Sequence, residues 1–173
     1  MTALTTSLAF ALAVQNRQKN NLEVAENLYR EILKTNPDHF ESIFDLGALL
    51  AQTKRFDLAK PLLQKATQIQ PNYADSHYNL GVALQELGEH QKAMSSYEKA
   101  ITIQPDYTKA YNNIGRVLQE LGQHQKAMSS YEKAITIQPD YAKAHYNIGK
   151  VLQELGEHKK AISFYQMAIK YEP

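Results

Sequence analysis

Histidines and glutamates recur through the chain in a way that raises the question of a catalytic or metal-binding site. The histidines are His90, His124 and His158, which follow one another at one constant interval of thirty-four. Imidazole is a common zinc ligand and general base. A metal ion needs ligands within a few ångströms of one another, whereas equivalent residues of packed helices lie about 8–10 Å apart. The histidines are therefore predicted to be solvent-facing turn residues.

The glutamates follow the same interval, and no catalytic motif accompanies them. They are Glu86, Glu120 and Glu154, each within a repeated LQEL segment. A carboxylate present in every unit is a feature of the unit. The sequence contains no glycine-rich phosphate loop, nucleophile elbow or HExxH motif. No catalytic residue, metal or cofactor is therefore predicted, and the chain is not expected to be an enzyme.

Asparagine is the third polar residue type with this spacing, and its chemistry suits a different task. Asn79, Asn113 and Asn147 are separated by the same interval. A carboxamide offers two N–H donors and one carbonyl acceptor, which complement the peptide group of another chain. On successive units about 10 Å apart, such amides would meet about every third residue of an extended polypeptide. Alternatively, they cap or fix local backbone, or face water.

The elements that must position these side chains follow from the same period. Proline, glycine and alanine each form columns with this spacing, and the segment HQKAMSSYEKAITIQPDY occurs unchanged at His90–Tyr107 and His124–Tyr141. The columns are Pro37, Pro71, Pro105, Pro139 and Pro173; Gly47, Gly81, Gly115 and Gly149; Ala25, Ala59, Ala93, Ala127 and Ala161. A fixed period of this length is typical of a solenoid of stacked helical units.

Each unit is predicted to contain two helices. In the third unit, apolar residues at helical spacing cover 74–87 and again 91–104, and Pro105 ends the second helix. Gly88, Gly122 and Gly156 suit a left-handed residue at the end of the first helix. Lys54 stands at that position in the second unit, which predicts a strained or altered turn. Aspartates 38, 106 and 140 are expected to cap the following helices.

Composition limits the classes of partner. With 19 basic and 18 acidic residues the net charge is +1, which gives no electrostatic footprint for nucleic acid. The chain has no cysteine, so disulfides and zinc–thiolate sites are excluded. The apolar run Leu8–Val14 is too short to span a bilayer, and no basic residue precedes it as in a signal peptide. We expect a cytoplasmic protein without membrane contact.

The residue columns resemble those of the tetratricopeptide repeat (TPR) family. The resemblance implies an all-α, right-handed superhelical solenoid of five helix-turn-helix repeats forming one domain over residues 1–173. The repeats are 6–39, 40–73, 74–107, 108–141 and 142–173. Departures include the absence of tryptophan, Leu63 in place of the usual aromatic, and Ala13 in place of glycine. Pentatricopeptide repeats, which read RNA, have a usual period of thirty-five and fit less well.

In the TPR family the first helix of each repeat lines a concave groove, which implies where a ligand lies. The asparagines resemble the ladder in the TPR domain of O-linked N-acetylglucosamine transferase, whose amides bind the backbone of an extended peptide. Neighbouring aromatic and basic positions would select apolar or acidic ligands. The groove residues implied are Asn79, Asn113, Asn147, Tyr78, Asn112, Tyr146, Lys109, Arg116, Lys143 and Lys150.

The function expected from this resemblance is a scaffold that holds an extended polypeptide, either acidic or with a free carboxylate. Chaperone-binding relatives use similar lysines, asparagines and arginine for a carboxylate, in a different order. One alternative is a targeting module of a larger enzyme such as a glycosyltransferase. Another is a homo-oligomer, because the apolar face of Ile162, Tyr165 and Ile169 is expected to lack a cap.

Overall fold

The computed structural model describes residues 5–172, and these form ten α-helices and no β-strand. The first helices of the five repeats are α1 (Thr6–Gln18), α3 (Phe40–Gln52), α5 (Ala74–Glu86), α7 (Thr108–Glu120) and α9 (Ala142–Glu154). The second helices are α2 (Leu22–Thr35), α4 (Phe56–Ile69), α6 (His90–Ile103), α8 (His124–Ile137) and α10 (His158–Tyr171). The predicted all-α class of helix-turn-helix repeats is therefore confirmed. The run Leu8–Val14 lies within α1, as expected.

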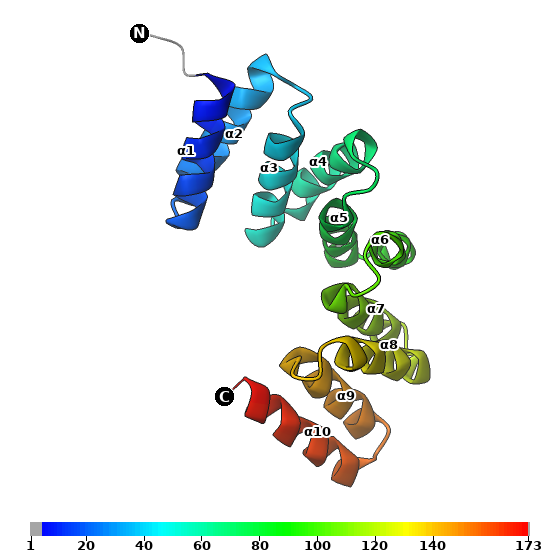
Figure 1. The fold of residues 1–173 in the computed structure, drawn as a ribbon. Coiled ribbons are helices and arrows are strands. Elements are labelled where there is room, and N and C mark those ends of the chain that lie inside the picture. The colour runs from blue at the N-terminus through cyan, green and yellow to red at the C-terminus, as the bar shows by residue number, and fades with distance from the viewer. Residues whose placement is uncertain (1–4, 173) are drawn as a thin grey trace. The chain divides into compact units, whose positions relative to one another are not determined.

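The contacts divide the chain into two compact units, the first ending at Glu89 and the second beginning at His90. In the first unit α1 packs on α2, α3 on α4, and α4 on α5. In the second unit α7 packs on α8, α9 on α10, and α8 on α9. Figure 1 shows the paired helices running antiparallel. A single domain over residues 1–173 stays a prediction, and Pro173 of the proline column lies outside the described residues.

The turns within the repeats share one hydrogen-bonding scheme. After α7, the amide of Gly122 donates to the carbonyl of Gln119 at 2.9 Å, and that of Gln123 to Leu118 at 2.8 Å. This is the Schellman arrangement, which needs a left-handed residue. Gly88, Gly122 and Gly156 have φ of 75°, 71° and 78°, as predicted. Asn20 and Lys54 take the same conformation, with φ of 61° and 60°.

The prediction that aspartates cap the first helices is wrong. The residues preceding α3, α7 and α9 at the cap position are His39, Tyr107 and Tyr141, and the tyrosines make no side-chain capping bond. Each helix begins one residue later than the aspartate cap requires. His39 does cap α3, because its Nδ1 accepts the backbone amide of Ser42 at 3.2 Å. Asp38 instead pairs with Lys65 of α4 at 2.8 Å.

Small residues allow the two helices of a repeat to approach closely. A Cβ atom added at Gly115 of α7 would lie 2.5 Å from the Tyr131 ring of α8. The corresponding distance from Gly149 of α9 to the Tyr165 ring is 2.6 Å. Tyr131 is fully buried, as are the alanines of the repeat columns beside it. At Gly47 the side chain in the way is Leu63, so a large side chain of the second helix occupies the space of a Cβ at each of these three glycines.

Replacing Lys54 by glycine is expected to stabilise the protein. A side chain in the left-handed region costs about 1–2 kcal/mol, which exceeds the entropic cost of glycine in the unfolded chain. Lys54→Gly should therefore raise the free energy of unfolding by about 1 kcal/mol, measured by urea titration. Asn20→Gly is the matched control and should gain less, because asparagine tolerates this conformation. Equal gains, or a loss at Lys54, would contradict the interpretation.

Replacing Gly115 by alanine is expected to destabilise the second unit. The added methyl group overpacks the buried Tyr131 ring, which costs about 1–3 kcal/mol and outweighs the helix propensity gained. Gly149→Ala should cost less, because Tyr165 is only partly buried and its ring can move. Thermal unfolding followed by circular dichroism compares the two variants. A neutral Gly115→Ala would show that the glycine is not needed for packing.

Candidate functional site

The predicted site residues lie on the first helices of three repeats. Eight of them belong to α7 and α9 of the second unit: Lys109, Asn112, Asn113, Arg116, Lys143, Tyr146, Asn147 and Lys150. Tyr78 and Asn79 belong to α5 of the first unit. The structure therefore brings the eight residues of α7 and α9 together on packed elements.

The three asparagines have different hydrogen-bond partners. The Nδ2 of Asn79 donates to the backbone carbonyl of Asp75 in its own helix at 2.8 Å. The Nδ2 of Asn113 donates to the hydroxyl of Tyr97 at 3.3 Å. The Nδ2 of Asn147 donates to Oδ1 of Asn112 at 3.0 Å. Asparagines at the same repeat position therefore do not make the same hydrogen bonds.

The difference between Asn79 and Asn113 matches the residue sixteen positions earlier. That residue is Tyr97 for Asn113, whereas it is Leu63 for Asn79 and offers no hydroxyl. In the second repeat Asp45 stands at the asparagine position, and the residue sixteen positions earlier is Tyr29. The Tyr29 hydroxyl donates to Oδ2 of Asp45 at 3.3 Å. For Asn147 the residue sixteen positions earlier is Tyr131, but its hydroxyl donates to Gln119, and Asn147 bonds Asn112 instead.

Burial sets the electrostatics of the Asp45 contact. Desolvation raises the pKa of Asp45, opposed by the nearby Arg17, whose guanidinium lies 2.8 Å from the carboxylate. Burial, together with the Asp45 charge, raises the pKa of Tyr29 to about 12. The tyrosine is therefore a neutral donor to the carboxylate. This contact is a structural pair and leaves no free nucleophile or acid.

Asn112 and Asn113 are buried, 4% and 8% exposed, so protein groups and not solvent surround them. The Nδ2 of Asn112 lies 3.4 Å from Oδ1 of Asn113, and the Oδ1 of Asn112 accepts from Asn147. Asn112 thus links the amides of two repeats. Asn147 is only partly buried and lines a pocket between α7 and α9.

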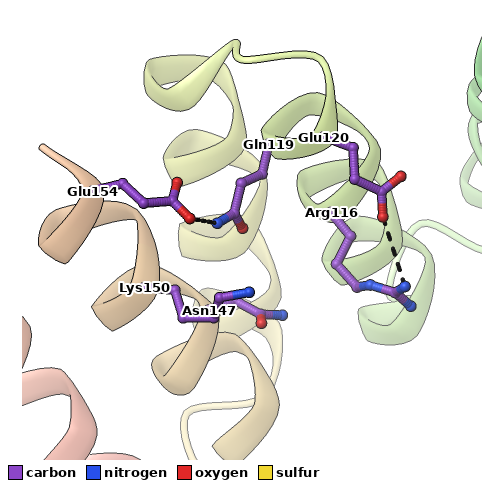
Figure 2. Close-up of a pocket in the computed structure, with 6 residues that line it drawn as sticks. All are labelled: Arg116, Gln119, Glu120, Asn147, Lys150 and Glu154. Carbon is purple, nitrogen blue, oxygen red and sulfur yellow. Dashed lines mark hydrogen bonds and ion pairs between the residues drawn. The ribbon is translucent and has the colours of Figure 1, made fainter.

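This pocket, which we name the α7–α9 pocket, has a volume of about 310 Å³. Figure 2 shows its six lining side chains, three from each helix. They are Arg116, Gln119, Glu120, Asn147, Lys150 and Glu154. All six are polar or charged, and the volume is at the lower end of the range for ligand pockets.

The carboxylates of the pocket are held by neighbouring donors. Glu154 accepts from Nε2 of Gln119 at 2.8 Å, and Glu120 lies 3.8 Å from the Arg116 guanidinium (Figure 2). Within residues 5–172, Lys150 pairs with no carboxylate. The pocket therefore presents an ammonium group that makes no close ion pair within the described residues, beside the amide of Asn147.

Two of the histidines also reach these carboxylates, which corrects their prediction as solvent-facing turn residues. His90 Nδ1 lies 3.5 Å from Glu120, and His124 Nδ1 lies 3.4 Å from Glu154. Both Nδ1 atoms are buried from solvent. Each histidine begins a second helix and faces the first helix of the next repeat. His90 and His124 thus join neighbouring repeats within the second unit.

Buried His145 has a packing role in α9. Its Nε2 lies 2.8 Å from the carbonyl oxygen of Pro139, and its ring lies 5.3 Å from that of Tyr171. His77 makes the same contact to the Pro71 carbonyl at 2.9 Å. His77 and His145 therefore each tie a first helix to the turn that precedes it.

Sequence reasoning missed three pocket residues: Gln119, Glu120 and Glu154. They belong to the LQEL segments, which recur in every later repeat and so looked purely structural. The signal that identifies them is their register, since they lie one turn beyond Arg116 and Lys150 on the same helix faces.

The remaining predicted residues lie on accessible surface. Lys109 and Lys143 are exposed in the first turns of α7 and α9. Tyr146 is half exposed, and its ring centroid lies 5.6 Å from that of Tyr165. On α10, Ile162 and Ile169 are 56% and 66% exposed. These two side chains form the apolar face expected there.

The described residues provide neither a bilayer-crossing helix nor a metal cluster. No helix among them combines the length and apolar character needed to cross a membrane. No three or more histidine, aspartate or glutamate side chains within residues 5–172 are grouped so as to hold a metal ion.

Comparison with solved structures gives relatives of similar size. The chain is 28% identical to a protein described as MamA, with a TM-score of 0.84 and coverage of 97% of this chain and 92% of that one. MamA from Desulfovibrio magneticus RS-1 is 20% identical, with a TM-score of 0.86 and coverage of 96% and 94%. YrrB, described as a TPR protein with an unusual peptide-binding site, is 22% identical, with a TM-score of 0.77 and coverage of 99% and 89%. The latter two likenesses concern the fold.

Family models give the same answer, although no curated protein matches the chain. Tetratricopeptide repeat models match residues 74–107, 142–173 and 96–128. A TPR repeat model matches residues 55–88 and 115–156. The chain is therefore an all-α solenoid that belongs to the tetratricopeptide-repeat family.

Proposed function

We propose that this protein-interaction scaffold holds an extended segment of a partner polypeptide against the first helices of its repeats. The observation that carries the proposal is the α7–α9 pocket, a polar depression of about 310 Å³ on the helices that line the groove in this family. Membership of the family supports the coarser function, a scaffold for protein interactions. The relative YrrB is itself described as having a peptide-binding site.

The pocket chemistry suits a peptide backbone. Asn147 donates one hydrogen bond, to Asn112, and its carboxamide has a carbonyl oxygen and a second N–H with which to meet a peptide group. The Gln119 side chain is fixed at both ends, because its Oε1 accepts from Tyr131 at 3.0 Å while its Nε2 donates to Glu154. In this proposal Asn147 contacts the ligand, while buried Asn112 positions it.

The charges of α7 and α9 favour an acidic partner. Lys150 lacks a carboxylate partner within the described residues, and Lys109 and Lys143 are exposed nearby on the same two helices. A carboxylate of the partner, internal or C-terminal, would form charge-assisted hydrogen bonds with Lys150. Asn79 and Tyr78 of α5 belong to the first unit, and a role for them in binding stays a prediction.

Two alternatives share parts of this surface. A targeting module within a larger enzyme would use the same pocket, so binding experiments apply equally to it. Neither interpretation gives the chain a catalytic role of its own. Self-association would instead use Ile162 and Ile169 of α10, which are more than half exposed. Light scattering over a range of concentrations separates this last case, because only self-association makes the mass depend on concentration.

Removing Asn147 and Lys150 is expected to weaken peptide binding. Each lost hydrogen bond to a ligand costs about 0.5–1.5 kcal/mol, and more when charged, so Asn147→Ala with Lys150→Ala should reduce affinity at least about tenfold. Binding is measured on an array of extended peptides with and without acidic residues. Acidic peptides should lose the most signal.

Asn79→Ala is the matched control, because its amide already bonds its own helix. It should change binding by less than the Asn147 and Lys150 double variant while leaving helicity intact. Unchanged binding in the double variant, with the fold preserved, would exclude the α7–α9 pocket as the binding site.

A further inference from the structure

A second pocket lies in the first unit, between the second helices α2 and α4. Its volume is about 400 Å³. Leu46 and Leu50 of α3 form its floor and are almost completely buried. Leu33 of α2 and Leu58 and Leu62 of α4 form its walls, and Leu58 is 51% exposed. We name this the α2–α4 pocket.

The residues of this pocket can be compared with those at the same repeat positions in the second unit, two repeats later. The floor is equally apolar in the two places, since Ile114 and Leu118 stand where Leu46 and Leu50 stand. The walls differ, since Lys126 and Ser130 replace Leu58 and Leu62. The apolar floor and the α2 wall, where Ile101 matches Leu33, therefore belong to the repeat pattern, whereas the two leucines of the α4 wall do not recur in α8. Exposed leucines that the repeat does not require indicate an interaction surface.

The rim of the pocket differs in charge as well. Arg30 and Lys34 of α2 stand at the rim, where the second unit has Glu98 and Thr102. Arg30 shares the carboxylate of Glu26 with Arg55, at 2.9 Å and 2.5 Å respectively. Because Arg30 and Arg55 share the single carboxylate of Glu26, one of their two positive charges is not neutralised by it. Lys34 pairs with Glu31, and both of these side chains are largely exposed, so this pair is weak and easily exchanged.

We propose that the α2–α4 pocket docks an acidic amphipathic helix of a partner protein, whose apolar side chains enter between the leucine walls while its carboxylates meet Arg30 and Lys34. Helices α2 and α4 each have 14 residues, which makes each about 21 Å long. A helix laid between them presents side chains every three or four residues to an apolar groove. This site is independent of the α7–α9 pocket and takes ligands of different chemistry.

The test uses the full chain and two synthetic peptides followed by fluorescence anisotropy. One peptide is an amphipathic helix with leucines on one face and glutamates on the other; the second carries lysines in place of the glutamates. The leucine–glutamate peptide should bind, and the lysine peptide should bind at least about tenfold more weakly, because Arg30 and Lys34 repel it. Equal binding of the two peptides, or no binding by either, would overturn the proposal.

Two double variants, one in the leucine walls and one in the basic rim, test whether the peptide binds at the α2–α4 pocket. Leu58→Lys with Leu62→Ser introduces the residues of the fourth repeat, so the fold is retained, and affinity should fall about tenfold or more. Arg30→Gln with Lys34→Thr should remove most of the preference for the acidic peptide. Lys126→Gln, at the repeat position of Leu58, should leave binding unchanged. Unchanged affinity in both pocket and rim variants, or displacement of the peptide by the fatty acid laurate, would overturn the assignment.

Discussion

Close contact between the two helices of a repeat is the constraint on which the rest of the structure depends. In the fourth repeat, Gly115 of α7 leaves the space that the buried Tyr131 ring of α8 fills. The ring fixes the rotation of α7, because every other residue of that helix carries a Cβ. The Tyr131 hydroxyl then holds the Gln119 side chain at 3.0 Å, on the pocket side of α7. Packing in the repeat thus positions the polar residues of the α7–α9 pocket.

Most of the fold could be predicted from the 34-residue period of the sequence. Glycine, alanine and proline columns predicted the paired helices and the left-handed turns, and Lys54 was identified as the exceptional turn residue. Helix starts were less predictable. A cap depends on a shift of one residue, and the aspartates 38, 106 and 140 lie one position too early for that role.

The candidate site was only partly predictable, because its contacts join residues of different repeats. Asn79, Asn113 and Asn147 are identical in sequence register, yet their partners are a backbone carbonyl, a tyrosine hydroxyl and another asparagine. Leu63 offers Asn79 no hydroxyl, Tyr97 bonds Asn113, and Tyr131 bonds Gln119 and not Asn147. Reasoning from the period treats all repeats as equal and misses this difference. For the same reason it missed the contacts of histidines 90 and 124 with the carboxylates of the following repeats.

The regularities of the repeat determine the fold, and both of our proposals rest on departures from it. In the second unit the departure is Lys150, which has no carboxylate partner among the described residues and lies beside polar amides. In the first unit it is a pair of leucines, Leu58 and Leu62, where later repeats have lysine and serine or phenylalanine. In our proposals one scaffold thus offers a polar surface suited to an extended acidic chain and an apolar one suited to a helix.

The most direct test of the central claim is nuclear magnetic resonance of the side-chain amides during titration with an extended acidic peptide. We predict that the NH₂ resonances of Asn147 and Gln119 shift to saturation, since both amides line the α7–α9 pocket. The NH₂ resonance of Asn16, which donates to the Leu12 carbonyl at 2.8 Å in the first unit, should stay unchanged. Saturable binding without any shift of Asn147 or Gln119 would contradict the proposed site, because the peptide would then lie elsewhere.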